Sequence, residues 1–108
     1  MSDTLAAILA LVDRAAVHVS NHAFEEMQKD GILPSAVIEN MGKARVVEDY
    51  PDANRGPSVL VLLEDRDNRP LHAVWGIPRQ RPDIAVLITA YRPDPKNWTS
   101  DFMKRSKT

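Results

Sequence analysis

The run IAVLITAY at residues 84–91 is the feature that most restricts how this chain can fold. Successive side chains of a strand point to opposite faces, and this run is apolar at both sets of positions. The alternation assigns its two faces as follows: Ile84, Val86 and Ile88 on one, and Ala85, Leu87, Thr89 and Tyr91 on the other. Such a strand is expected in the middle of a sheet, with other structure packed against each face.

Helical patterns precede this strand. Apolar residues recur at helical spacing over 3–16, and a second helix is predicted over about 22–30. Pro34 suits the first turn of a third helix. Residues 17–19 alternate in polarity and are expected to form a short extended link.

The pattern changes after residue 43, where short apolar runs alternate with loops rich in Pro, Asp, Asn and Gly. A short last helix is predicted to contain Phe102 and Met103. Helices followed by a series of strands with short loops predict an α+β fold with a four-stranded antiparallel sheet and the helices on one face. Its strands are expected at 44–48, 59–63, 71–77 and 84–91.

Length and composition narrow the class of protein. A chain of 108 residues is expected to form a single domain over 1–108, and 44% apolar with 27% charged residues is typical of a folded domain. The absence of cysteine excludes disulfides, thiol catalysis and cysteine-ligated zinc. No run approaches the ~20 apolar residues of a membrane span. A cytoplasmic protein without a membrane partner is therefore predicted.

Charge is unevenly distributed along the chain. Residues 1–42 carry two basic and six acidic side chains, whereas residues 92–108 carry five basic and two acidic ones, within a net charge of −1. The basic end could meet a phosphate backbone, or it could simply be a solvated terminal segment.

Metal and cofactor motifs are absent from the sequence. His22 and Glu26 are spaced to share one helix face, but two ligands do not make a metal site. No metal and no cofactor are therefore predicted.

Two histidines and a tyrosine are the candidates for acid and base chemistry. His22 and His72 could transfer protons near neutral pH, or they could cap a helix and face a satisfied neighbour on a sheet. Tyr91 could donate a proton or stack on a base. Metal-free RNA cleavage needs such a base and acid, with cations to stabilise the phosphorane. The candidates for substrate binding are Arg55, Thr89, Arg92, Lys104 and Arg105.

Several segments, taken together, resemble the uncharacterised domain family numbered 4258. They are HVSNHAFEEMQKDGI (18–32), VVEDYP (46–51), RPLHAVWGI (69–77) and IAVLITAYRPDPKNW (84–98). The resemblance covers about residues 17–105 and leaves 1–16 as an N-terminal helical extension.

That family is similar to the RelE/ParE-like toxin superfamily, whose fold is a small antiparallel sheet with helices on one face. The resemblance implies toxin–antitoxin biology and RNA cleavage, with the family histidines at His22 and His72 and its TAY motif at Thr89 and Tyr91.

Two hypotheses follow. The first is a metal-independent endoribonuclease toxin that binds RNA and an antitoxin protein, with His22 and His72 sharing the acid and base work. The second is a non-catalytic protein-binding or regulatory module on the same fold, favoured by the acidic N-terminal part of the chain. Glu26 and Asp30, where the family often has arginine, count against a nuclease. The first helix could then serve as a homodimer or partner surface, or it could pack on its own sheet.

Overall fold

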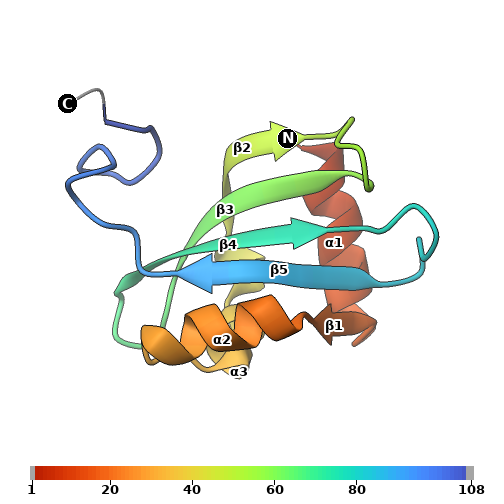
Figure 1. Cartoon of the computed structure of the whole chain (residues 1–108), viewed down its shortest axis with the longest axis horizontal. Helices are drawn as coiled ribbons and strands as arrows, with labels where there is room; N and C mark the ends of the chain where they lie inside the picture. The colour runs from red at the N-terminus through yellow and green to blue at the C-terminus, as the bar shows by residue number, and fades with distance from the viewer. Residues whose placement is uncertain (1, 107–108) are drawn as a thin grey trace.

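The computed structural model describes residues 2–106 and shows an α+β fold (Figure 1). Its helices and strands follow one another in the order α1 (Asp3–Asp13), β1 (Val17–Val19), α2 (Asn21–Lys29), α3 (Pro34–Glu39), the 3-10 helix η1 (Met41–Lys43), β2 (Arg45–Tyr50), β3 (Ser58–Glu64), β4 (Pro70–Gly76) and β5 (Ala85–Tyr91). Within the described range, no helix is long and apolar enough to cross a membrane.

The sheet is mixed and has five strands in the order β1-β5-β4-β3-β2. Strands β2 to β5 form the predicted antiparallel series, but β1 pairs with β5 in parallel, Val17 opposite Ala85 and Val19 opposite Leu87. The prediction of four strands was therefore wrong, because a three-residue alternation does not reveal a partner that lies almost seventy residues away. The central strand is β4, and β5 lies one place nearer the edge.

A bulge in β5 corrects the predicted assignment of its faces. Val74 pairs with Thr89 and Trp75 pairs with Leu87, so Ile88 is an extra residue between them. The alternation reverses at this residue. Leu87 and Ala90 belong to the buried core, whereas Thr89 and Tyr91 lie on the opposite face of the sheet.

One continuous core joins the helices to one face of the sheet. Helix α1 contributes Leu5, Ile8 and Leu11, and thus packs on its own sheet instead of presenting these residues to a partner. The remaining core side chains come from α2, the loop after it, α3, η1 and alternate positions of the strands: Ala23, Met27, Ile32, Val37, Met41, Val59, Val61, Leu63, Leu71, Ala73, Trp75, Ala85, Leu87 and Ala90.

Local signals fix where α2 begins. Ser20 Oγ accepts a hydrogen bond from Ala23 N and donates one to Ile88 O, so the cap of α2 is tied to the bulge in β5. Helix α2 consequently runs along β5 at this edge of the sheet (Figure 1).

The C-terminal segment, residues 93–106, is not the predicted helix. Asn97 and Ser106 are joined by a backbone hydrogen bond, Trp98 and Arg105 form an isolated bridge, and Phe102 has a left-handed backbone with φ +60°. Asp101 accepts hydrogen bonds from Thr99 Oγ1 and from Met103 N, which stabilises the tight turn at the expense of a helix.

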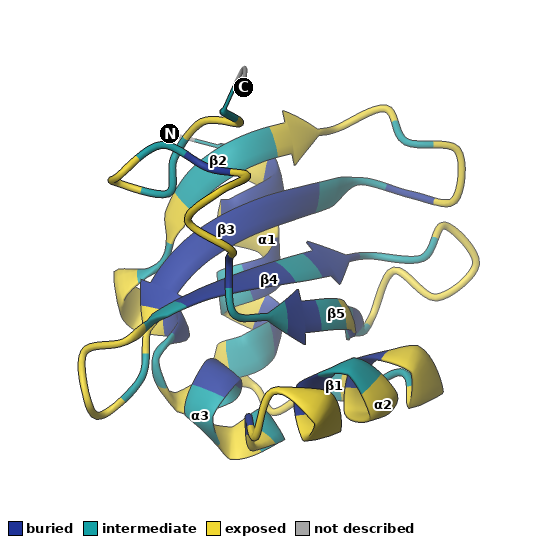
Figure 2. Ribbon diagram, turned by 60° about the vertical axis from the view of Figure 1, so that its left-hand side comes forward, coloured by how far each residue is buried: buried dark blue, intermediate teal, exposed yellow. Residues whose placement is uncertain are grey.

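This segment covers the face of the sheet that the helices leave free, which is called the open face below. Leu60, Leu62 and His72 lie on the open face and are nevertheless buried, and Trp98 is buried beside them. Figure 2 shows the C-terminal segment in front of β3 and β4. The sheet therefore has a second, small core on the face away from the helices.

Candidate functional site

The candidate site lies on the open face, where the C-terminal segment meets β2, β4 and β5. It is called the open-face cluster and consists of Glu48, Tyr50, His72, Tyr91, Trp98 and Arg105.

His72 is fully buried and both of its ring nitrogens have partners. Nε2 lies 2.9 Å from Phe102 O, and Nδ1 lies 3.2 Å from Tyr91 Oη. A carbonyl oxygen can only accept, so Nε2 must carry the hydrogen. In the neutral ring Nδ1 is then an acceptor, and the hydroxyl of Tyr91 donates to it. The proton positions of the pair are thus determined by the backbone carbonyl.

The electrostatics keep both partners of this pair neutral near pH 7. Burial lowers the pKa of His72, although its hydrogen bond to the Phe102 carbonyl opposes the shift. Burial likewise raises the pKa of the Tyr91 hydroxyl. The Trp98 ring packs edge-on against the imidazole with centroids 4.4 Å apart, which excludes water from this side.

An ion pair lies beside the histidine. Arg105 donates to Glu48 through Nε (3.1 Å to Oε2) and Nη2 (3.0 Å to Oε1), and Tyr50 Oη donates to the same carboxylate. Arg105 and then Tyr50 lower the pKa of Glu48, which keeps it ionised. The guanidinium also stacks over the Trp98 ring at 4.9 Å. Since two of its five N–H groups bond Glu48, the others can meet an anion.

Two bulges bring these side chains to the same face. In β2, Val46 opposes the core residue Val61, whereas Glu48 opposes Leu60 on the open face, because Val47 is an extra residue. The bulge at Ile88 acts on Tyr91 in the same way. If the same residues followed regular alternation, Glu48 would share the core face with Val46, and Tyr91 would share it with Leu87.

The structure brings three of the predicted site residues together, namely His72, Tyr91 and Arg105. Lys104 is exposed beside Arg105, and Thr89 lies on the open face opposite Val74.

His22 does not join this group. It is exposed on α2, and the ring nitrogens of His72 have other partners.

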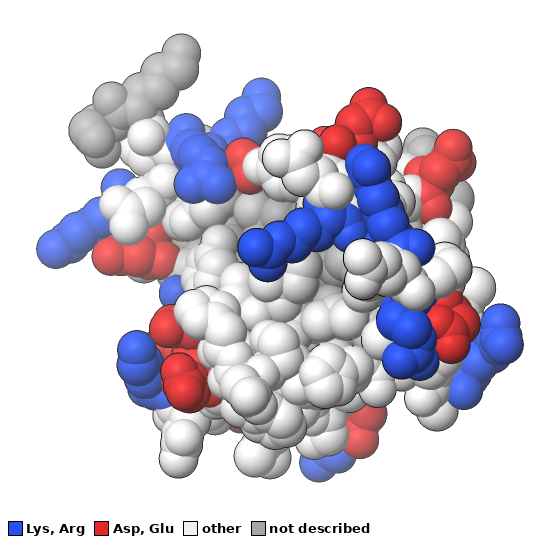
Figure 3. All heavy atoms as spheres, turned by 45° about the vertical axis from the view of Figure 1, so that its right-hand side comes forward, with Lys and Arg blue, Asp and Glu red and all other residues white. Residues whose placement is uncertain are grey.

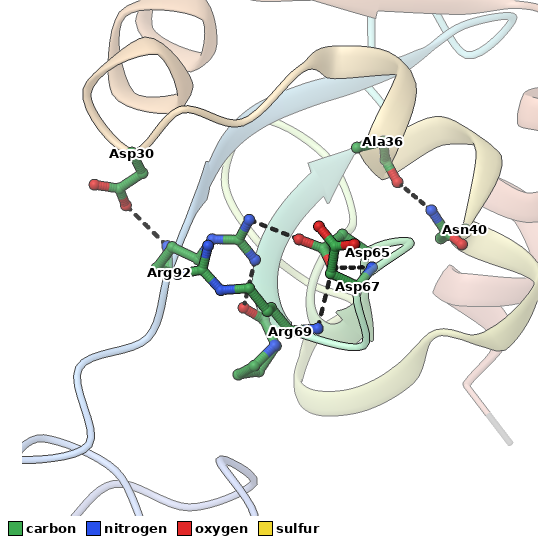
Figure 4. A network of polar contacts seen from close by, with 8 residues as sticks. Asp30, Ala36, Asn40, Asp65, Asp67, Arg69 and Arg92 are labelled. Carbon is green, nitrogen blue, oxygen red and sulfur yellow. Dashed lines mark hydrogen bonds and ion pairs between the residues drawn. The ribbon is translucent and has the colours of Figure 1, made fainter.

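The backbone and the side chain of Arg92 both form contacts within the fold (Figure 4). Its Nη2 lies 2.6 Å from Asp65 Oδ2, its Nη1 donates to Pro70 O, and its backbone N–H donates to Asp30. Although partial burial opposes the shift, the backbone N–H of Arg69 and the Arg92 guanidinium lower the pKa of Asp65. Arg92 thus anchors the end of β5 to the loop before β4.

Arg55 is exposed in the loop between β2 and β3, beyond the end of β2 at which Tyr50 lies and not beside His72. Across residues 2–106, no group of three or more His, Cys, Asp or Glu side chains could hold a metal ion.

Sequence reasoning missed Glu48, Tyr50 and Trp98. Glu48 and Tyr50 are two residues apart in VVEDY, which indicates a shared face, but nothing in the sequence reveals which face. Trp98 is buried as expected of a core tryptophan, yet it is buried on the open face.

The fold and the cluster define an α+β protein with a neutral His–Tyr pair and an adjacent Arg–Glu pair on one sheet face. The family described as Domain of unknown function (DUF4258) matches residues 19–92, and the chain belongs to it. The match includes Glu48, Tyr50, His72 and Tyr91 but not the C-terminal segment. No curated protein and no solved structure matches the chain.

Proposed function

We propose that this protein is a metal-independent endoribonuclease of the RelE/ParE-like kind, acting as the toxin of a toxin–antitoxin pair. The observation that carries the proposal is the hydrogen bond between Tyr91 and His72, whose direction is set by the Phe102 carbonyl. Such a pair can move a proton without a metal. The sheet with helices on one face also fits the superfamily.

Tyr91 is the member of the pair that can reach a substrate, because it is partly exposed and His72 is not. In the proposed reaction, Tyr91 Oη takes the proton of the RNA 2′-hydroxyl while its own proton passes to His72 Nδ1. The 2′-oxygen then bonds to phosphorus, the bond from phosphorus to the 5′-oxygen breaks, and the same path returns the proton to the 5′-oxygen. The products are a 2′,3′-cyclic phosphate and a 5′-hydroxyl. His72 is thereby a positioning and proton-storing residue.

Arg105 supplies the charge that this reaction needs. Its free N–H groups would bind the phosphorane oxygens, and Glu48 holds the guanidinium in a fixed orientation.

The test is controlled expression in a bacterial host with transcript ends mapped. The wild type should produce new ends, Tyr91→Phe should abolish them, and the exposed His22→Ala should retain them. New ends that persist in Tyr91→Phe would refute the proton path, and no new ends in the wild type would refute the nuclease.

A second candidate function, binding of a protein partner without catalysis, is favoured by an apolar hollow of about 420 Å³ beside α2. Phe24 and Leu33 are 50% and 69% exposed there. The hollow is lined by Phe24, Met27, Gln28, Gly31, Ile32, Leu33 and Pro34. Growth arrest without new transcript ends, lost in Leu33→Asp and retained in Tyr91→Phe, would support this alternative.

A further inference from the structure

Two loops at the far end of the sheet from the C-terminal segment are fastened to each other. Residues 51–57 follow β2 and residues 77–84 follow β4. Ile77 N donates to Pro57 O at 2.9 Å, and Arg79 N donates to Arg55 O at 3.1 Å. The Arg79 guanidinium donates to Ala53 O at 3.2 Å. The two loops therefore behave as one rigid element.

Gly56 makes this contact sterically possible. Its φ is +131°, and a Cβ there would lie 2.0 Å from Ile77 O. Only glycine allows the two backbones to approach so closely. The backbones of Arg55 and Arg79 are consequently held side by side.

Arg55 and Arg79 differ from the four arginines that form ion pairs within the fold. Both are exposed, and neither has a carboxylate partner among residues 2–106. In contrast, the guanidinium groups of Arg66, Arg81, Arg92 and Arg105 each pair with a carboxylate. Figure 3, which brings this end of the molecule forward, shows basic side chains lying together near the upper middle of this face, with acidic side chains around them.

The open face connects this element to the open-face cluster. Gly76, which leads into the second loop, lies four residues after His72 on β4, hence about 13 Å along the strand. On β3, β4 and β5, the open-face residues between the two ends are uncharged: Ser58, Leu60, Val74, Val86 and Thr89. On β2, the carboxylate of Glu48 is paired with Arg105. A polyanion that extended from Arg105 along these three strands would therefore meet Arg55 and Arg79 at the other end of the sheet.

We infer that Arg55 and Arg79 form a second phosphate-binding site, which holds single-stranded RNA several nucleotides away from the bond that is cleaved. This inference rests on the proposed ribonuclease function and extends it to a substrate longer than the reacting dinucleotide. Guanidinium groups suit this role because each can bond two phosphate oxygens. The uncharged open-face side chains of β3, β4 and β5 between the two ends impose no base preference.

The test compares the binding of fluorescein-labelled 2′-O-methyl RNAs of 3 and 12 nucleotides, which cannot be cleaved, by fluorescence anisotropy at several salt concentrations. The protein variants are the wild type, Arg55→Ala/Arg79→Ala and the control Lys29→Ala/Arg66→Ala. The control changes net charge equally at two cations that already pair with carboxylates.

For the longer RNA, the slope of log affinity against log salt should become shallower by about 1.4 in Arg55→Ala/Arg79→Ala, since each phosphate contact on a single strand contributes about 0.7. The slope should not change for the shorter RNA or in the control. Arg55→Ala alone removes no hydrogen bond of the loop contact and should change the slope by about 0.7, which keeps the test valid if the double variant unfolds.

Two results would overturn the inference in distinguishable ways. Binding of the longer RNA with an unchanged slope in both Arg55 variants, or an equal change in the control, would refute the second site alone. Failure of the wild type to bind either RNA would refute the ribonuclease proposal, and this inference with it.

Discussion

Replacement of Gly56 by alanine tests the fold at the place where two loops meet. The new Cβ would lie 2.0 Å from a backbone carbonyl, and the φ of +131° is strained for any residue with a side chain. The strain costs about 1–3 kcal/mol. Relief of the clash must separate the loops and break two backbone hydrogen bonds, each contributing about 1 kcal/mol. Gly56→Ala should therefore lower the free energy of unfolding by about 3–5 kcal/mol.

Two other glycines provide matched controls. Gly31 has φ +67° with no atom near an added Cβ, so Gly31→Ala should cost about 1–2 kcal/mol of backbone strain alone. A Cβ at Gly42 also meets open space, and Gly42 has no positive φ, so Gly42→Ala should be neutral or stabilise by up to about 1 kcal/mol. Urea unfolding of the three variants measures the series. The steric reasoning would be refuted if Gly56→Ala were no less stable than Gly31→Ala.

Three further predictions concern the open-face cluster and the anchor of β5. Burial lowers the pKa of His72 in the folded state, so the unfolded chain takes up the proton first as the pH falls. The free energy of unfolding should therefore decrease as pH drops through about 6.5. Urea midpoints between pH 7.5 and 5 will show this decrease in the wild type but not in His72→Gln. Trp98→Ala should lower the free energy of unfolding by about 3 kcal/mol. Because water would then reach the imidazole, the pKa of His72 should rise toward its ordinary value in an NMR titration, and an unchanged pKa would contradict burial as the cause of the shift. Arg92→Met should lower the free energy of unfolding in urea by about 1–3 kcal/mol, because the Asp65 carboxylate loses its partly buried partner. Stability equal to the wild type would show that the backbone N–H groups alone satisfy this carboxylate.

Local sequence signals predicted most of the elements. The positions of α1, α2 and α3, the four antiparallel strands and the strand locations of His72 and Tyr91 follow from apolar periodicity and from proline and glycine. The parallel pairing of Val17–Val19 with β5 was not predictable from those three residues. It depends on how the helices that lie between the two strands in the sequence pack on the sheet.

The candidate site was predictable only in part, for two physical reasons. A bulge changes which face a side chain occupies without changing the local sequence pattern, so Glu48 was not recognised. The C-terminal segment contains residues that suit a helix, but it forms a turn at Asp101. The turn forms because the Asp101 carboxylate accepts hydrogen bonds from Thr99 Oγ1 and Met103 N. Trp98 was therefore not expected over His72.

The extra residues at Val47 and Ile88 also have a consequence for the inheritance of this fold. Each is an extra residue in a pattern of period two, so that the residues on either side of it, two apart in sequence, lie on opposite faces of the sheet. Because each is the residue that the pairing leaves out, loss of its codon would restore a regular ladder and leave the faces of its neighbours unchanged. A deletion of Ile88 would keep Tyr91 opposite His72, but it would remove the carbonyl that accepts from Ser20 Oγ. We therefore expect lineages that have lost this residue to keep the open-face cluster while the start of α2 is released from β5.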